Sequence, residues 1–148
     1  MTITQTTTPA QVLVKFSYAY IQFHEATNLF EMVFTSKMNE TEFIAVNKAL
    51  LDEFRKKQSN RLLVNALNMG VISTGGQKWV VENLVPGMIS HLKGRNLYHA
   101  QIIPEKDVFG KFAAKNIEDR ASKVPGMVMI AFSNAKEGMD WLLQQPDR

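Results

Sequence analysis

The hydroxyls of Ser73 and Thr74 stand where an apolar run, residues 62–64, gives way through a polar turn to the start of a predicted helix. A hydroxyl at a helix N-terminus lies beside free backbone N–H groups and the positive end of the helix dipole, which together stabilise a phosphate. Ser73 and Thr74 are therefore candidate phosphoacceptors. The alternative is that Thr74 only caps the helix through its hydroxyl, which explains the residue type without any modification.

The neighbours of this helix start are candidates for binding a partner or a ligand. In an open α/β sheet such sites lie outside the carboxyl ends of the strands. Asn68 lies in the predicted loop, and Gln77 lies in the first turn of the helix. Gly75 and Gly76 have no side chain, so a partner or an anion can approach the backbone closely there. The alternative for both glycines is conformational freedom of the loop.

Asp107 follows the next predicted strand and can reach the Ser73 loop if the two strands are neighbours. A Ser73–Asp107 pair without a histidine is a poor catalyst, because an ionised aspartate is a weak base for a hydroxyl. Asp107 can equally cap the helix that follows it. The patterns Gly-x-Ser-x-Gly, Gly-x-x-x-x-Gly-Lys and Gly-x-Gly-x-x-Gly are absent. We therefore predict no catalytic residue, no cofactor and a protein that is not an enzyme.

Metal ligands are scarce in this chain. The histidines His24, His91 and His99 lack the HExxH and i, i+4 spacings of a metal site, and we interpret them as surface or half-buried structural residues. Cysteine is absent, which excludes disulfides, thiolate metal sites and cysteine nucleophiles. No metal site is predicted.

Three aromatic residues could line a pocket near the carboxyl ends of the third and fourth predicted strands. Trp79, Phe109 and Phe112 would suit an apolar, lipid-like ligand there. However, aromatic residues at helical spacing are usually part of the core, and a chain of this length has little spare volume for a lipid cavity. Both interpretations stay open at this point.

The composition predicts one globular domain. With 148 residues, 45% of them hydrophobic, and a formal net charge of +3, the chain can bury a core and shows no basic stripe typical of nucleic-acid binders. The nearest candidate for a basic patch, residues 55–57 with Arg61, falls at a predicted helix C-terminus, where the helix dipole favours cations. We expect a flexible tail over residues 1–11, a domain over 12–146, no signal peptide, no membrane span and a cytoplasmic location.

Hydrophobic periodicity predicts five strands and four helices in the order β-β-α-β-α-β-α-β-α. The predicted strands cover residues 12–25, 29–35, 61–67, 96–103 and 127–132. The predicted helices cover residues 40–57, 74–93, 107–120 and 134–145. A short gap makes the first two strands an antiparallel hairpin, and the alternating remainder implies a parallel sheet, so the sheet should be mixed.

Short-range signals fix several helix ends. Three pairs have capping-box spacing: Asn39 with Glu42, Thr74 with Gln77, and Asn134 with Glu137. Residues 86–87, a Pro-Gly pair, should kink or break the second helix. Asn65 falls within an apolar strand, where a buried amide needs partners, so it either orients the 68–73 loop or a ligand, or bonds the neighbouring backbone.

This element order resembles the SpoIIAA-like fold, which STAS domains share with CRAL-TRIO lipid-carrier domains. Residues 62–79 are similar to the STAS signature, in which a strand ending in an acidic or amide residue leads to an Asp-Ser-Ser-Gly-type helix start. Three stretches resemble small bacterial STAS-like proteins without an assigned function. They are residues 68–73 with Gln77 and Trp79, residues 104–111, and Ala135 with residues 141–142.

The chain departs from the family at the phosphorylated position. In anti-sigma-factor antagonists of this family, a partner kinase phosphorylates a serine in the first turn of the second helix. Here Ser73 stands in place of the family's aspartate, and the phosphoacceptor falls on Thr74 or Gly75, depending on a one-residue shift. The resemblance allows phosphorylation of Ser73 or Thr74 without implying it.

Together these observations predict a SpoIIAA/STAS-like regulatory or protein-interaction module. It would present residues 68–77 to a protein partner, with the 104–110 loop beside them. The alternative function is binding of a small apolar ligand near Trp79, Phe109 and Phe112. Self-association is a further expectation, because the aromatic-rich first strand could lie at a sheet edge, and an exposed edge can pair with a second copy.

Overall fold

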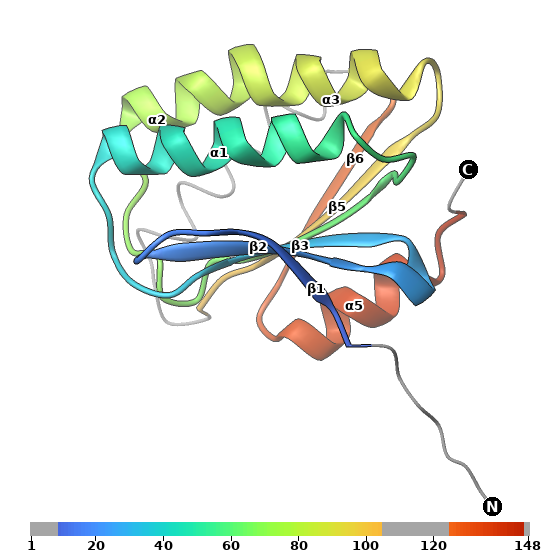
Figure 1. The fold of residues 1–148 in the computed structure, drawn as a ribbon, viewed down its shortest axis with the longest axis horizontal. Coiled ribbons are helices and arrows are strands. Elements are labelled where there is room, and N and C mark those ends of the chain that lie inside the picture. Colours follow the sequence, from blue (N-terminus) through green and yellow to red (C-terminus); the bar gives the residue numbers. More distant parts are fainter. Residues whose placement is uncertain (1–8, 105–124, 147–148) are drawn as a thin grey trace, which may run out of the picture.

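The computed structural model describes residues 9–104 and 125–146, which build a six-stranded mixed sheet with helices on both faces (Figure 1). The strands are β1 (Gln11–Lys15), β2 (Ala19–His24), β3 (Leu29–Phe34), β4 (Arg61–Asn65), β5 (Leu97–Ile102) and β6 (Met127–Phe132), and they lie side by side in that order. The pairs β1–β2 and β2–β3 are antiparallel, whereas β3 to β6 run parallel. The predicted α/β class, mixed sheet and N-terminal antiparallel pairing are confirmed.

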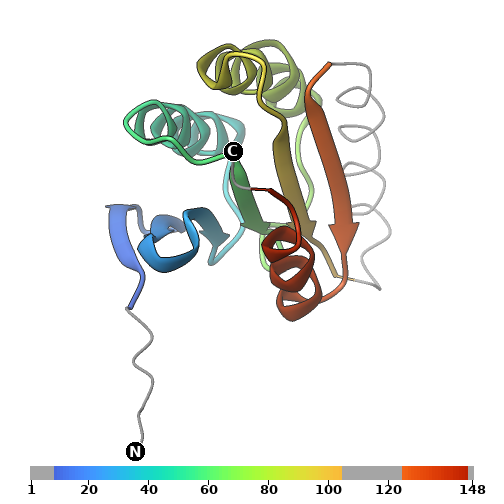
Figure 2. The ribbon, with the colours of Figure 1, turned by 90° about the vertical axis from the view of Figure 1, so that its right-hand side faces the viewer.

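The helices form one layer on each side of the sheet. On one face lie α1 (Glu40–Phe54) and a long helix made of α2 (Thr74–Trp79), the π-helical segment η2 (Val80–Leu84) and α3 (Val85–Leu92). On the other face lies α5 (Ala135–Leu143), which Figure 2 shows across the sheet from α1 and α3. A 3₁₀ turn, η1 (Glu25–Thr27), joins β2 to β3. The helix predicted over residues 107–120 lies outside the described residues.

The prediction of one strand over residues 12–25 is wrong, because the chain reverses within it. Residues 16–18 turn β1 back onto β2, and the Phe16 amide donates to the Ala19 carbonyl at 2.7 Å. The Phe16 and Tyr18 rings lie 5.3 Å apart, and Tyr18 Oη donates to the Glu42 carbonyl of α1 at 3.2 Å. These tertiary contacts hold aromatic residues in a turn whose composition is typical of a strand. The sheet edge is therefore formed by β1, not by the aromatic-rich β2.

Residues 86–87 do not break the helix, which continues from α2 through α3. One turn earlier the helix widens, and the Val85 amide donates to the Val80 carbonyl, five residues back. A wider turn relieves the clash between a proline ring and the preceding carbonyls. The Asn83 side chain donates to the Trp79 carbonyl at 3.2 Å. Gly87 faces α1, where an added Cβ would lie 2.9 Å from Leu51 Cδ1, so a glycine permits this close helix contact.

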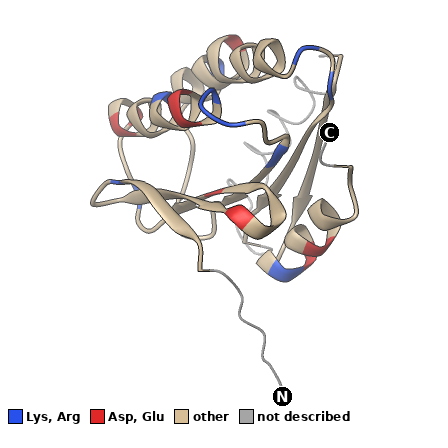
Figure 3. Ribbon diagram, turned by 45° about the vertical axis from the view of Figure 1, so that its right-hand side comes forward, with Lys and Arg blue, Asp and Glu red and all other residues tan. Residues whose placement is uncertain are grey.

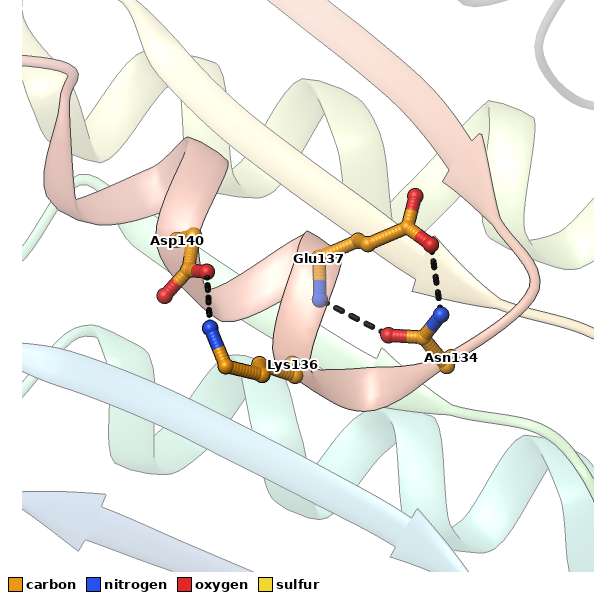
Figure 4. Close-up of polar contacts among 4 residues, drawn as sticks. All are labelled: Asn134, Lys136, Glu137 and Asp140. Carbon is orange, nitrogen blue, oxygen red and sulfur yellow. Dashed lines mark hydrogen bonds and ion pairs between the residues drawn. The ribbon is translucent and has the colours of Figure 1, made fainter.

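The predicted N-caps of α1 and α5 are confirmed, and α1 has the complete capping box. Asn39 Oδ1 accepts from the Glu42 amide at 2.8 Å, and Glu42 Oε1 accepts from the Asn39 amide at 2.9 Å. Figure 4 shows the start of α5, where Asn134 Oδ1 accepts from the Glu137 amide at 2.9 Å. There Glu137 Oε1 accepts from the Asn134 side chain at 2.5 Å, so the second bond of the box is made by side chains.

Two apolar clusters hold the layers together. The larger one lies between the sheet and the α1/α3 layer and contains the fully buried Phe30, Phe54 and Met88. The smaller one lies under α5 and includes Leu63 and Leu142. Because β4 and β5 are covered on both faces, their side chains are buried almost throughout. Within the described part of the chain, no helix is long and apolar enough to cross a membrane.

Arg61, a buried residue of β4, forms hydrogen bonds that link the end of α5 to the sheet. Arg61, which is 8% exposed, donates from Nη1 to the Thr27 carbonyl at 2.7 Å and from Nη2 to the Gln145 carbonyl at 2.6 Å. Asn60 Nδ2 donates to the Pro146 carbonyl at 3.1 Å. The carbonyls at a helix C-terminus carry partial negative charge, so they suit a guanidinium that lies away from water.

Candidate functional site

The candidate site lies at the carboxyl ends of β3 and β4. These two strands are parallel, so the loops that follow them emerge at the same edge and lead into α1 and α2. We call residues 37–40 and 67–77 together the carboxyl-edge surface. It contains six of the seven predicted binding residues: Asn68, Ser73, Thr74, Gly75, Gly76 and Gln77.

The loop after β4 is held by hydrogen bonds to its surroundings. The Ala66 amide donates to the Ile102 carbonyl of β5 at 2.8 Å, and the Met69 amide donates to the Ala66 carbonyl at 3.2 Å. Asn65 Oδ1 accepts from the Leu67 amide at 3.2 Å, so Asn65 bonds the neighbouring backbone, as one of its two interpretations proposed. Gly70 has φ of 80°, a left-handed conformation that favours glycine.

Ser73, and not Thr74, is the N-cap of α2. Ser73 Oγ accepts a hydrogen bond from the Gly76 amide at 3.0 Å, whereas Thr74 is the first helical residue and is exposed. The predicted Thr74–Gln77 capping box is therefore wrong. Gln77 Nε2 instead donates to the Ile72 carbonyl at 3.0 Å. By residue type, either Ser73 or Thr74 could be the N-cap of the helix. Packing of the helix against α1 favours Ser73.

Ser73 also contacts the first turn of α1. Its hydroxyl donates to Glu40 Oε1 at 2.7 Å while its oxygen accepts from Gly76. A phosphate on Ser73 would replace the donated hydrogen bond and place further negative charge beside the Glu40 carboxylate, which is unfavourable. The negative charge that a helix N-terminus attracts is already supplied here by Glu40.

Both glycines at the start of α2 face α1. A Cβ added at Gly75 would overlap the Glu40 carboxylate, and one added at Gly76 would lie 2.9 Å from Phe43 Cδ2. Close approach of α1 therefore requires a small residue at Gly76, whereas a side chain at Gly75 would displace the Glu40 carboxylate from Ser73. A bulky substitution at either glycine would disturb the helix pair, so exposed residues of the surface give a cleaner test of binding.

A groove runs along the carboxyl-edge surface. It has a volume of about 400 Å³ and is lined by Lys37, Met38, Met69, Gly70 and Val71. The stem of Lys37 covers Gly70, since a Cβ there would lie 3.1 Å from Lys37 Cγ. Val71 is 64% exposed, the largest exposure of any large hydrophobic residue described. Leu67, at 38% exposure, belongs to the same loop, so this loop beside the groove exposes two large apolar side chains.

The predicted aromatic pocket is described only in part. Trp79 is half-buried and packs against the larger core cluster. The other two pocket residues, Phe109 and Phe112, lie outside the described residues, and so does Asp107. The condition for Asp107 to reach the Ser73 loop, that β4 and β5 are neighbours, is met. The lipid-pocket alternative therefore stays a prediction. Native mass spectrometry of freshly purified protein tests it, because a co-purifying lipid adds mass.

His99 is wholly buried, which corrects its interpretation as a surface or half-buried residue. Its side chain lines a cavity of about 30 Å³ between the sheet and the helix layer. Neither of its ring nitrogens has a hydrogen-bond partner, and burial lowers the pKa of the imidazole from 6.5 to about 4. The burial pattern of β5 was missed because apolar periodicity does not reveal that a strand is covered on both faces. His24 and His91 are half-buried, as predicted.

The other histidines make ordinary polar contacts. On the sheet face opposite α1, Glu31 Oε1 accepts from Gln22 at 2.9 Å and lies 2.7 Å from His24 Nε2. Burial raises the pKa of Glu31, but the hydrogen bonds from His24 and Gln22 outweigh it, so the pKa is lowered overall. His91 Nε2 lies 2.7 Å from the Lys57 carbonyl. Among the described residues, no three His, Cys, Asp or Glu side chains gather in a way that could hold a metal ion.

Charged residues do not mark a separate site. Figure 3 shows Lys and Arg on several elements, with a group where α1 and α3 end. In that group Lys56 pairs with Glu53 at 2.9 Å, and Lys57 Nζ lies 4.4 Å above the Phe23 ring. These cations follow the C-terminus of α1, where the helix dipole favours them.

The carboxyl edge presents one hydroxyl whose hydrogen bonds to its surroundings are defined. Ser73, its best-placed hydroxyl, contacts a carboxylate and a backbone amide and no histidine. Activation of a serine requires a base within hydrogen-bond reach, and a carboxylate is a weak one. Comparisons of the chain with protein-family models, with curated proteins and with solved structures give no match.

Proposed function

We propose that this protein is a non-enzymatic, STAS-like regulatory module that binds a protein partner through the carboxyl-edge surface. The observation that carries the proposal is the 64% exposure of Val71 beside a groove of about 400 Å³. Leu67, at 38% exposure, extends the apolar area along the same loop. Exposed apolar side chains rimmed by polar ones are the composition of protein interfaces.

The fixed conformation of the loop supports this role. Its ends are tied to β5 through the Ala66 amide and to α1 through Ser73 and Glu40. A surface that is ordered before binding loses less conformational entropy when a partner docks. The groove also contains Lys37, a cation on a flexible stem that can pair with an acidic group of the partner.

The STAS-like part of the proposal rests on the sequence resemblance and on the strand–loop–helix junction at residues 62–79. Phosphate control through Ser73 is disfavoured by its contact with Glu40, whereas the exposed Thr74 hydroxyl is accessible to a kinase. Regulation by phosphorylation is therefore not required for the proposed function.

The test compares two exposed valines on different parts of the molecule. Val71→Asp places a charge on the carboxyl-edge surface, whereas Val12→Asp places the same charge on edge strand β1, where Val12 is 54% exposed. The wild-type protein and both variants would be immobilised and exposed to a lysate of the organism that encodes the chain. Each captured protein would then be quantified and its dissociation constant measured with purified material.

We expect a specific partner to bind the wild type and Val12→Asp equally, and to bind Val71→Asp at least tenfold more weakly. Equal binding to all three would contradict the proposed surface. Loss of binding with Val12→Asp alone would assign recognition to the β1 edge, the position at which self-association was predicted. Circular dichroism of each variant would establish that the fold is retained.

A further inference from the structure

A second possible site lies inside the protein, directly beneath the carboxyl-edge surface. The cavity that contains His99 has a volume of about 30 Å³, which is room for one hydroxyl-sized group or one water molecule. Its lining is mostly apolar, and His99, Gln101 and Asn47 are its polar members. Asn47 Nδ2 is already used, since it donates to the Phe43 carbonyl at 2.9 Å.

His99 lacks the hydrogen bonds that a buried imidazole needs. Neither Nδ1 nor Nε2 has a partner among the residues that the structure describes, and His99 is 6% exposed. A buried donor or acceptor that is left without a partner destabilises the folded protein. With a pKa of about 4, the ring is neutral at pH 7, so it offers one N–H donor and one acceptor nitrogen. A hydroxyl group can pair with either nitrogen, because it accepts from an N–H and donates to an acceptor nitrogen.

The cavity is separated from the surface by a thin wall of side chains. Phe43, Met69 and Ile72 line the cavity, and the same three residues line a surface pocket of about 50 Å³ beside Ser73 and Glu40. Met69 also lines the larger groove outside. Methionine is unbranched and changes its rotamer readily, so this wall can yield to an apolar chain.

We propose that the His99 cavity receives the hydroxyl group of a small, uncharged amphipathic molecule whose apolar part lies between Phe43, Met69 and Ile72 and points toward the groove. A charged head group does not suit the site, because none of the described residues that line the cavity is ionised and an unpaired buried charge is very unfavourable. The site is distinct from the predicted aromatic pocket, because Trp79 does not line this cavity. The proposal does not depend on the proposed function, since it concerns the inner side of the wall.

The experiment uses 1-hexanol, hexanoate and n-hexane as probes of the full-length protein at pH 7. Nitrogen chemical shifts of the His99 ring report hydrogen bonding in the cavity, and the methyl resonance of Met69 reports movement of the wall. We expect 1-hexanol to shift both signals in a saturable manner. Hexanoate, with a charged head, and n-hexane, with none, should bind at least tenfold more weakly.

Two variants separate the cavity from the surface. His99→Leu removes the hydrogen-bonding head-group site and should abolish the preference for 1-hexanol over n-hexane. His24→Leu, a histidine on the sheet face opposite α1, is the matched control and should leave the preference unchanged. The wild-type titration stands on its own if His99→Leu does not fold.

Three results would overturn the proposal. Nuclear Overhauser contacts from His99 to a long-lived water, with no saturable response to 1-hexanol, would make the cavity a hydration site only. Shifts at Met69 and Val71 without a shift at His99 would place the alcohol in the groove alone. Equal affinity for 1-hexanol and hexanoate would remove the argument for an uncharged head group.

Discussion

Ser73 Oγ donates to Glu40 Oε1 at 2.7 Å and thereby joins the first turns of α2 and α1. The same oxygen caps α2 by accepting from the Gly76 amide at 3.0 Å. The start of the second helix is therefore fixed by one side chain that bonds in two directions. This arrangement makes the helix start part of the α1–α2 contact.

The first prediction concerns this pair. Ser73→Ala removes the cap and should lower the free energy of unfolding by about 1 kcal/mol. Ser73→Asp retains a capping oxygen but places a second carboxylate beside Glu40. Its cost should therefore be larger in the wild-type background than in Glu40→Gln, by about 0.5 kcal/mol. Urea unfolding of the four proteins of this double-mutant cycle measures the difference. An equal cost of Ser73→Asp in both backgrounds would mean that Glu40 does not oppose negative charge at Ser73.

The second prediction concerns acid stability. The pKa of His99 is about 4 in the folded protein, below the 6.5 of a free histidine, so the unfolded chain binds its proton more tightly. Stability is therefore present in full above pH 6.5 and is lost as the pH falls toward 4, by up to about 3 kcal/mol. Urea unfolding at a series of pH values measures this loss.

His99→Leu should flatten the stability profile between pH 6.5 and pH 4. Glu31→Gln is the matched control, because the lowered pKa of Glu31 affects stability only at more acid pH, as that carboxylate becomes protonated. An unchanged profile in His99→Leu would show that the imidazole reaches solvent in the folded protein.

The third prediction concerns Arg61. Arg61→Met removes charge-assisted hydrogen bonds to the Thr27 and Gln145 carbonyls, at 2.7 and 2.6 Å, and should lower the free energy of unfolding by about 3 kcal/mol. Arg95→Met is the control, since Arg95 Nη1 donates to the Gln58 carbonyl at 3.3 Å in an exposed position. Hydrogen exchange should also show faster exchange at the end of α5 in Arg61→Met. Equal losses for the two arginines would refute the anchoring role.

The fourth prediction concerns the packing of α5 on the sheet. A Cβ at Gly138 would lie 2.6 Å from Ile102 Cδ1 and 3.1 Å from Leu63 Cδ1, so Gly138→Ala overpacks the smaller cluster. We expect a loss of about 1–3 kcal/mol in spite of the higher helix propensity of alanine. Leu143→Ala, at an exposed position of the same helix, should change the thermal midpoint much less. A stabilised Gly138→Ala protein would mean that α5 lies further from the sheet.

The sequence by itself determined the features that depend on neighbouring residues. Apolar runs that follow turn residues identified β3 and β6, and the capping residues Asn39 and Asn134 marked the starts of α1 and α5. These signals are local, because a cap bonds an amide three residues away and a short apolar run is adjacent to the turn residues that bound it.

Only the tertiary structure decided the remaining features. The turn at residues 16–18 is held by contact with α1. Ser73 rather than Thr74 caps α2 because of the contacts with Glu40 and Phe43. The helix continues past Pro86 through a widened turn. The burial of His99 likewise arises because β5 is covered on both faces. In each case the contacting residues are distant in the sequence, so local propensity and periodicity cannot predict the contact.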